Sequence, residues 1–225
     1  MPFPRPVRDS ARPTIAFRLA SAVSRPVVRR VYRLTVTAPA ELPSRGFVLC
    51  ANHLSGFDAW ALSIPLYPRQ PRYLAKAELF LPPFGRLLAS LGLLPVRRGE
   101  GNDGVIATAV EHARSGHVVL VFPEGARRRN RVLRPRTGAA RIALAAGVPL
   151  VPAAVRGTDD ARRFRRWLVA FGPPVPLDDL DPDLPDAAAE ATRRLWDAVL
   201  ALEDTLDGSV RSAPLPHEHA VGVGT

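Results

Sequence analysis

The sequence predicts a single α/β domain with a mixed, largely parallel sheet flanked by helices, preceded by a basic amphipathic helical element. Three observations lead to this prediction. Short apolar segments typical of buried strands alternate with segments whose apolar residues recur at helical spacing. Such alternation is typical of parallel strands that are joined by helices. The 225 residues, 47% of them apolar, are enough to bury a real core, and no internal repeat interrupts the alternation.

The expected elements can be placed in order after residue 30. Strands are predicted at 31–37, 47–51, 72–75, 93–97, 117–122, 149–155 and 166–171. Helices are predicted at 56–64, 84–91, 104–114 and 138–146, with a long last helix at 186–206. Gly116 and Gly147 are expected to end the helices before them. We therefore expect one domain over residues 34–207 and a disordered tail at 208–225.

Residues 1–33 are expected to form a separate segment at a membrane interface. They contain eight arginines and one acidic residue. Within 13–33, Arg18, Arg25, Arg29 and Arg33 fall on one side of a helix, and Ala16, Leu19, Ala20, Val23, Val27 and Val31 fall on the other. Pro26 is expected to kink or split this helix. A basic amphipathic helix commonly lies in a bilayer interface. The alternative is a helix packed on the domain with its arginines in water, and the near absence of acids favours the interface.

Composition narrows the class of function. The net charge of +10 indicates anionic partners, such as phosphorylated small molecules, nucleic acid or an acidic membrane surface. Lys76 is the single lysine among 31 basic residues. One cysteine, Cys50, excludes an internal disulfide framework and a cysteine-based zinc site. Since no long uncharged apolar run and no signal-peptide core are found, an intracellular protein without a spanning helix is expected.

The most informative motif is Asn52-His53-Leu54-Ser55-Gly56-Phe57-Asp58, between a predicted strand and a predicted helix. An imidazole there can take a proton near neutral pH, and a carboxylate on the first helical turn can hold its other ring nitrogen. His53 and Asp58 are therefore candidates for a general base and the group that orients it. The alternative is structural, because Ser55 to Asp58 also fits a capping box in which Asp58 serves only the helix start.

Three further segments place turns or arginines where predicted strands end. Residues 92–99 end a strand in Arg97 and Arg98, and residues 147–157 form a strand with prolines at its edges. Residues 117–127 lead into a Pro-Glu-Gly turn and then a basic run at 127–131. Glycine allows a ligand close to the backbone, and arginine can grip a phosphate with two hydrogen bonds. Taken singly, residues 117–127 favour a tight turn followed by a solvated basic loop, and residues 147–157 fit a strand with proline at its edges.

Together and in this order, the four segments resemble the motifs of the glycerolipid acyltransferases, which include 1-acyl-sn-glycerol-3-phosphate and glycerol-3-phosphate acyltransferases. Asn52, His53 and Asp58 match Asn-His-x-x-x-x-Asp, and residues 92–98 match Gly-x-Ile/Leu-x-Val-x-Arg. Residues 122–127 match Phe-Pro-Glu-Gly-Thr/Ser-Arg, and residues 148–152 match Val-Pro-x-x-Pro. The likeness covers residues 30–175. It departs at Ala126, where the family usually has a small hydroxyl residue, and at Arg136, where lysine is common.

The resemblance implies that an acyl group passes from an acyl thioester, acyl-CoA or acyl-ACP, to the hydroxyl of a phosphorylated glycerolipid. The expected acceptor is 1-acyl-sn-glycerol-3-phosphate, which would give phosphatidic acid. His53 would be the base and Asp58 its orienting group, while the acceptor would be bound by Lys76, Arg98 and Arg127, in a pocket shaped by Glu124 and Gly125. Main-chain amides near the first helix start are candidates to stabilise the oxyanion. No metal and no cofactor other than the thioester co-substrate is expected.

The basic amphipathic segment and the lack of a signal-peptide core or spanning helix predict a peripheral protein at the cytoplasmic face of the cell membrane, with an anionic membrane surface as partner. Other interpretations remain open at this point. They are acyl transfer to another lipid acceptor, hydrolysis by the same histidine–aspartate pair, and a non-enzymatic basic protein that binds membrane or nucleic acid. Because no nucleic-acid fold signature is present and aromatic residues are few, no nucleic-acid partner is expected.

Overall fold

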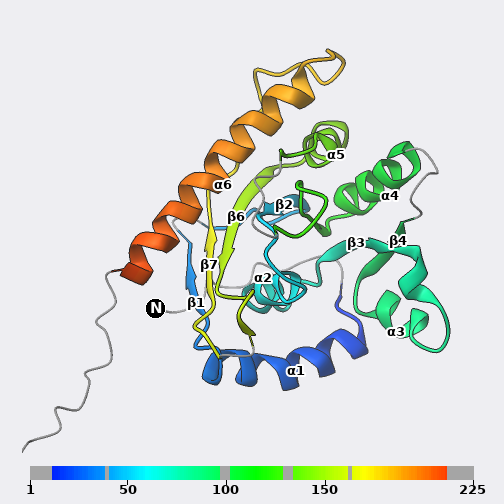
Figure 1. Cartoon of the computed structure of the whole chain (residues 1–225). Helices are drawn as coiled ribbons and strands as arrows, with labels where there is room; N and C mark the ends of the chain where they lie inside the picture. The colour runs from blue at the N-terminus through cyan, green and yellow to red at the C-terminus, as the bar shows by residue number, and fades with distance from the viewer. Residues whose placement is uncertain (1–11, 39–40, 97–101, 129–133, 162–163, 212–225) are drawn as a thin grey trace, which may run out of the picture.

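One seven-stranded sheet organises the chain (Figure 1). The computed structural model describes residues 12–38, 41–96, 102–128, 134–161 and 164–211. The strands are β1 (Thr35–Thr37), β2 (Phe47–Ala51), β3 (Arg72–Lys76), β4 (Leu93–Val96), β5 (Val118–Val121), β6 (Leu150–Arg156) and β7 (Leu168–Phe171). The helices are α1 (Ile15–Arg30), α2 (Asp58–Leu66), α3 (Gly85–Ser90), α4 (Asn102–Arg114), α5 (Gly138–Ala146) and α6 (Ala187–Arg211), with a 3-10 turn η1 (Ala77–Phe80).

The sheet is mixed and largely parallel, as the alternation of elements predicts. Its strand order is β1-β7-β6-β2-β5-β3-β4, and every neighbouring pair is parallel except β6 and β7. In a parallel sheet the carboxyl ends of the strands lie at one edge. Strands β2, β3, β4, β5 and β6 therefore deliver the loops that follow them to the same edge, although those loops are far apart in the sequence.

Helices cover both faces of the sheet (Figure 1). Side chains alternate along β2, so Phe47, Leu49 and Ala51 face one layer and Val48 and Cys50 the other. The first layer contains α2, with α1 outside it, and the second contains α4, α5 and α6. This burial on both faces explains why β2 and β6 are nearly continuous apolar runs rather than alternating ones.

The N-terminal helix differs from one expectation and agrees with another. Pro26 lies inside a single helix, so it does not split α1 into two elements. Ala22 and Pro26 are both exposed, so water can satisfy the carbonyl that loses its donor. The apolar side is largely exposed at Leu19, Val23 and Val27, as the interface interpretation expects, while Phe17, Ser21 and Val28 face inward.

Helix boundaries elsewhere follow local signals, with one correction. Gly147 ends α5 in the left-handed conformation, with φ of 64°, as the sequence predicts. The last helix continues to Arg211, so the tail expected from residue 208 was placed too early. Residues 1–11 and 212–225 lie outside the described residues. In the described part of the chain, no helix has both the length and the apolar character that a membrane crossing needs.

Candidate active site

Two neighbouring parallel strands bring together the first motif, residues 52–58, and the third motif, residues 122–127. β2 pairs with β5 in a register that places Cys50 opposite Val121. Asn52 and His53 follow the end of β2, and Phe122 to Glu124 follow the end of β5. The two loops therefore meet at the carboxyl edge of the sheet, where α/β proteins commonly bind ligands.

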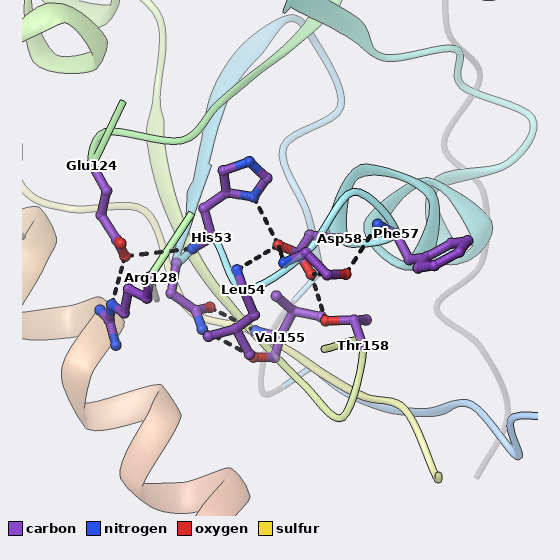
Figure 2. Close-up of polar contacts among 10 residues, drawn as sticks. His53, Leu54, Phe57, Asp58, Glu124, Arg128, Val155 and Thr158 are labelled. Carbon is purple, nitrogen blue, oxygen red and sulfur yellow. Dashed lines mark hydrogen bonds and ion pairs between the residues drawn. The ribbon is translucent and has the colours of Figure 1, made fainter. Parts of the chain in front are cut away.

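His53 and Asp58 are in contact, as the sequence predicts. Nδ1 of His53 lies 2.8 Å from Oδ2 of Asp58 (Figure 2). An ionised carboxylate only accepts hydrogen bonds, so Nδ1 carries the proton and Nε2 is the basic nitrogen. Figure 2 shows the imidazole turned so that its other nitrogen points away from Asp58. The His53 side chain is 19% exposed, which leaves the ring accessible to a substrate.

The carboxylate of Asp58 is fully buried and accepts hydrogen bonds from four residues. Oδ2 accepts from the amides of Leu54 at 2.6 Å and Ser55 at 2.8 Å, besides the imidazole. Oδ1 accepts from the hydroxyls of Ser55 and Thr158. The bond from the Ser55 amide matches one half of a capping box, but the N-cap of α2 is Phe57, which makes no side-chain capping bond, so the bonds of Asp58 order the loop and do not form a complete box. Asp58 therefore does both: it orders the loop before α2 and it orients His53.

The main chain and the ring of His53 are held by the loop after β5. The His53 amide donates to Oε1 of Glu124 at 3.4 Å, and the His53 carbonyl accepts from the Arg128 amide at 2.7 Å. The imidazole stacks on Phe122, with ring centroids 4.1 Å apart and planes 17° apart. The histidine is thus fixed at its backbone on both sides and on one ring face.

The fourth motif supports the first through the backbone of β6. The Asn52 side-chain amide donates to the carbonyl of Val155 at 2.9 Å, and its oxygen accepts from the amide of Val155 at 2.8 Å. Both groups are fully buried. Directly after the strand, Gly157 turns the chain with φ of 81°, and Thr158 then reaches Asp58.

The residues predicted to bind substrate fall into two groups. Glu124 is buried, and it contacts the main chain of His53 and the guanidinium of Arg128. Burial raises the pKa of the Glu124 carboxyl above its ordinary value, although Arg128 acts in the opposite direction. Gly125 adopts φ of 69°, and a Cβ there would come within 3.1 Å of the guanidinium of Arg136. Glu124 is therefore in place to hold the loop, and Gly125 is a position that only glycine fits well.

The three predicted cationic residues are placed to different extents. Arg127 is exposed, and its guanidinium lies against Gly56, where a Cβ would be 3.4 Å from Nη2. Lys76 ends β3 at the same edge of the sheet, but its side chain is not among those described. Arg98 follows β4 and lies outside the described residues. The structure thus brings Arg127 to the loop that carries His53.

Four residues of the site were not predicted to serve it: Phe122, Arg128, Val155 and Thr158. The first two lie within or beside the third motif, so adjacency to Glu124 was an available signal. Thr158 had only a weak signal, a hydroxyl residue after a glycine at the end of a buried strand. In the described part of the chain, no cluster of three histidine, cysteine or acidic residues is arranged to hold a metal ion.

Residues 33–156 match the family model described as Acyltransferase. The chain belongs to the acyltransferase family, and it is an enzyme. The matched segment contains both loops that hold His53, whereas Thr158 and the whole of α6 lie beyond it. The segment that matches the family model therefore includes the two loops that form the candidate site.

Curated relatives support the same assignment. The chain is 32% identical over 167 residues to a 1-acyl-sn-glycerol-3-phosphate acyltransferase of Bacillus subtilis, covering 72% of this chain and 83% of that protein. It is 30% identical over 173 residues to the enzyme of the same name from Escherichia coli, covering 72% and 71%.

The fold of the acyltransferase also has a solved counterpart. It resembles the crystal structure of the 1-acyl-sn-glycerophosphate acyltransferase PlsC from Thermotoga maritima, with a TM-score of 0.57 and 19% identity. The likeness covers 88% of this chain and 84% of that one. At this identity the comparison concerns the fold alone.

Proposed function

We propose that this acyltransferase acylates 1-acyl-sn-glycerol-3-phosphate, with an acyl thioester as donor, to form phosphatidic acid. The observation that carries the proposal is the His53–Asp58 pair, whose tautomer leaves Nε2 as a base at an accessible edge of the sheet. The names of the curated relatives support the choice of acceptor.

In this mechanism Nε2 of His53 takes the proton of the acceptor hydroxyl as its oxygen attacks the thioester carbonyl. The tetrahedral intermediate then collapses, the carbon–sulfur bond breaks, and the thiolate receives the proton from the imidazolium. Asp58 stabilises that imidazolium and keeps the ring oriented. Because the attacking oxygen belongs to the substrate, the reaction needs no nucleophile from the enzyme.

Most of the main-chain amides near the start of α2, which were expected to stabilise the oxyanion, already donate to other acceptors. Between Leu54 and Asp58, four amides already have acceptors within the loop. Leu54 and Ser55 donate to the Asp58 carboxylate, and Phe57 and Asp58 donate to oxygens of Ser55. A donor to the oxyanion is therefore to be sought outside these four amides.

We assign the binding of the acceptor phosphate to arginine and lysine side chains at the carboxyl edge of the sheet. Arg127 supports this because its exposed guanidinium lies beside Gly56, within the loop that carries the base. Lys76 is the last residue of β3 and Arg98 follows β4 in the sequence, and both strands have their carboxyl ends at that edge, which supports a role for these two residues. Gly125 and Glu124 would shape the pocket by fixing the turn between these groups.

A peripheral position at the cytoplasmic face of an anionic membrane is part of this proposal. The support is the exposed apolar stripe of α1, formed by Ile15, Leu19, Val23 and Val27. The side chains of Ile15 and Val23 are more than 70% exposed, at 74% and 72%. A stripe of this kind beside arginines favours a bilayer surface over water.

The test is product analysis with radiolabelled acyl-CoA and, separately, acyl-ACP, each with 1-acyl-sn-glycerol-3-phosphate in mixed vesicles. Labelled phosphatidic acid is the expected product, and free fatty acid alone would instead indicate a hydrolase. Glycerol 3-phosphate serves as the competing acceptor. The membrane part is tested by sedimentation with anionic vesicles, from which Leu19→Asp combined with Val23→Asp should release the protein.

A further inference from the structure

We propose that Glu203, on the C-terminal helix α6, is a positioning residue for the base of the reaction. It would act through the Arg128 guanidinium, which holds Glu124 and thereby the main chain of His53. This inference rests on the proposed function, in which His53 is the base. Residue 203 lies beyond the segment that matches the family model, which ends at residue 156.

The first step is the contact between α6 and the loop after β5. Nη1 of Arg128 lies 2.9 Å from Oε1 and 3.0 Å from Oε2 of Glu203, so both carboxylate oxygens share one nitrogen. The guanidinium also lies over the ring of Trp196, with its carbon 5.3 Å from the ring centroid. Glu203 is buried, and two residues of α6 thus fix where the guanidinium stands.

The second step leads from Arg128 to Glu124. Nε of Arg128 lies 2.9 Å from Oε1 of Glu124, whose side chain is completely buried (Figure 2). The same Oε1 accepts from the His53 amide. The Arg128 guanidinium, held by Glu203, therefore keeps Oε1 of Glu124 in place to accept from the His53 amide.

The third step is the geometry at His53. Its amide is held by Glu124 and its carbonyl by the amide of Arg128 at 2.7 Å. Arg128 thus contributes to both ends of the His53 residue, once through its side chain and once through its main chain. Since small displacements of a catalytic base reduce turnover strongly, the anchoring of Arg128 should affect the rate.

Loss of the Glu203 charge would leave Arg128 with one carboxylate partner in the described part of the site. The Arg128 side chain is 23% exposed, so it could turn toward water and release Glu124. Burial already raises the pKa values of Glu124 and Glu203, with Arg128 opposing the shift in both. The two carboxylates therefore depend on the same cation for compensation of their buried charge.

The test uses the full chain with Glu203→Gln, Glu203→Asp and Arg128→Gln. In Glu203→Gln, kcat should fall about 10-fold while KM for the acceptor stays within about twofold, because the base is displaced but the acceptor contacts remain. Glu203→Asp keeps the charge and should recover part of kcat. In the Arg128→Gln background, Glu203→Gln should have little further effect, because its route to His53 is already lost.

Asp207→Asn is the matched control. Asp207 lies one turn later on α6 and pairs with Arg156, without a contact to the loop after β5 among the described interactions. It should lower the thermal midpoint to a similar degree as Glu203→Gln but leave kcat unchanged. A fall in thermal midpoint with kcat unchanged in Glu203→Gln would overturn the proposal, as would a rise in KM alone.

A second measurement separates this proposal from the proposed function. The backbone amide resonance of His53, assigned with His53→Ala, should shift in Glu203→Gln and stay in place in Asp207→Asn, with no substrate present. An unshifted resonance would overturn the positioning role even if the enzyme forms phosphatidic acid. A shifted resonance in a protein that forms no ester would instead contradict the proposed function alone.

Discussion

The hydroxyl of Thr158 donates a hydrogen bond to Oδ1 of Asp58, although 100 residues separate them in the chain. Both side chains are buried. The bond joins the turn after β6 to the loop after β2, so two segments of the chain hold the Asp58 carboxylate. Asp58 consequently reaches His53 from a position that neither loop could fix by itself.

Replacement of this hydroxyl tests its role directly. Thr158→Val keeps the shape but removes the donor, so Oδ1 loses a buried hydrogen bond, and a destabilisation of about 1–3 kcal/mol is expected. We also expect a lower kcat, because the Asp58 carboxylate is then held only from its own loop and less firmly against His53. Thr158→Ser keeps the donor and should retain most of both. Urea unfolding and initial rates measure the two effects, and equal rates for the valine and serine variants would contradict them.

Loss of the base should abolish most turnover without unfolding the protein. His53→Ala is expected to reduce kcat by about 10²–10⁴-fold, the range typical of a general base. The circular dichroism spectrum should be unchanged because the side chain is part-exposed and contributes little to the core. His112→Ala, at a helix end away from this edge, is a suitable control. Near-normal rates in His53→Ala would remove the basis of the mechanism.

Neutralisation of the carboxylate separates orientation from charge. Asp58→Asn retains an oxygen that can accept from the Leu54 and Ser55 amides, but it cannot stabilise the imidazolium. We expect kcat to fall about 10³–10⁴-fold, as in other histidine–aspartate pairs. A variant with wild-type kcat would show that Asp58 only caps the helix.

The Asn52 amide should contribute to stability more than to chemistry. Asn52→Ala removes two buried hydrogen bonds and leaves the amide and carbonyl of Val155 without these partners. The expected cost is about 2 kcal/mol or more, read from urea unfolding. Asn52→Asp should also be destabilising, because a carboxylate can accept from Val155 but cannot donate to it. Stability equal to that of the native chain in both variants would contradict this role.

A surface network at the start of α6 should make stability depend on pH. Hydrogen bonds from Arg193 and Arg194 lower the pKa of Glu190 to about 2 from 4.5. Since folding lowers the pKa of Glu190, the stabilisation of the folded state by its charge is present above pH 4.5 and is lost as the pH falls toward 2. Glu190→Gln should therefore lower the thermal midpoint slightly at pH 7, and the difference should vanish near pH 2.

The order of strands and helices follows from the sequence because each element has a local cause. β2 and β6 are unbroken apolar runs, and Gly147 ends α5 in a conformation that favours glycine. The contact between His53 and Asp58 was also predictable, because five residues separate them and a strand-to-helix turn brings them together. The end of α6 was less predictable, since a helix can extend beyond its apolar stripe when its other face is solvated.

Local patterns thus determined most of the elements, the family motifs and the contact between His53 and Asp58. The tertiary structure alone decided which strands are neighbours, and with them the contacts of Asn52 with Val155, Asp58 with Thr158 and Arg128 with Glu203. It also decided that the apolar stripe of α1 faces outward. The reason is physical: periodicity records which face of an element is apolar, whereas a hydrogen bond across 75 or 100 residues depends on the packing of the whole sheet.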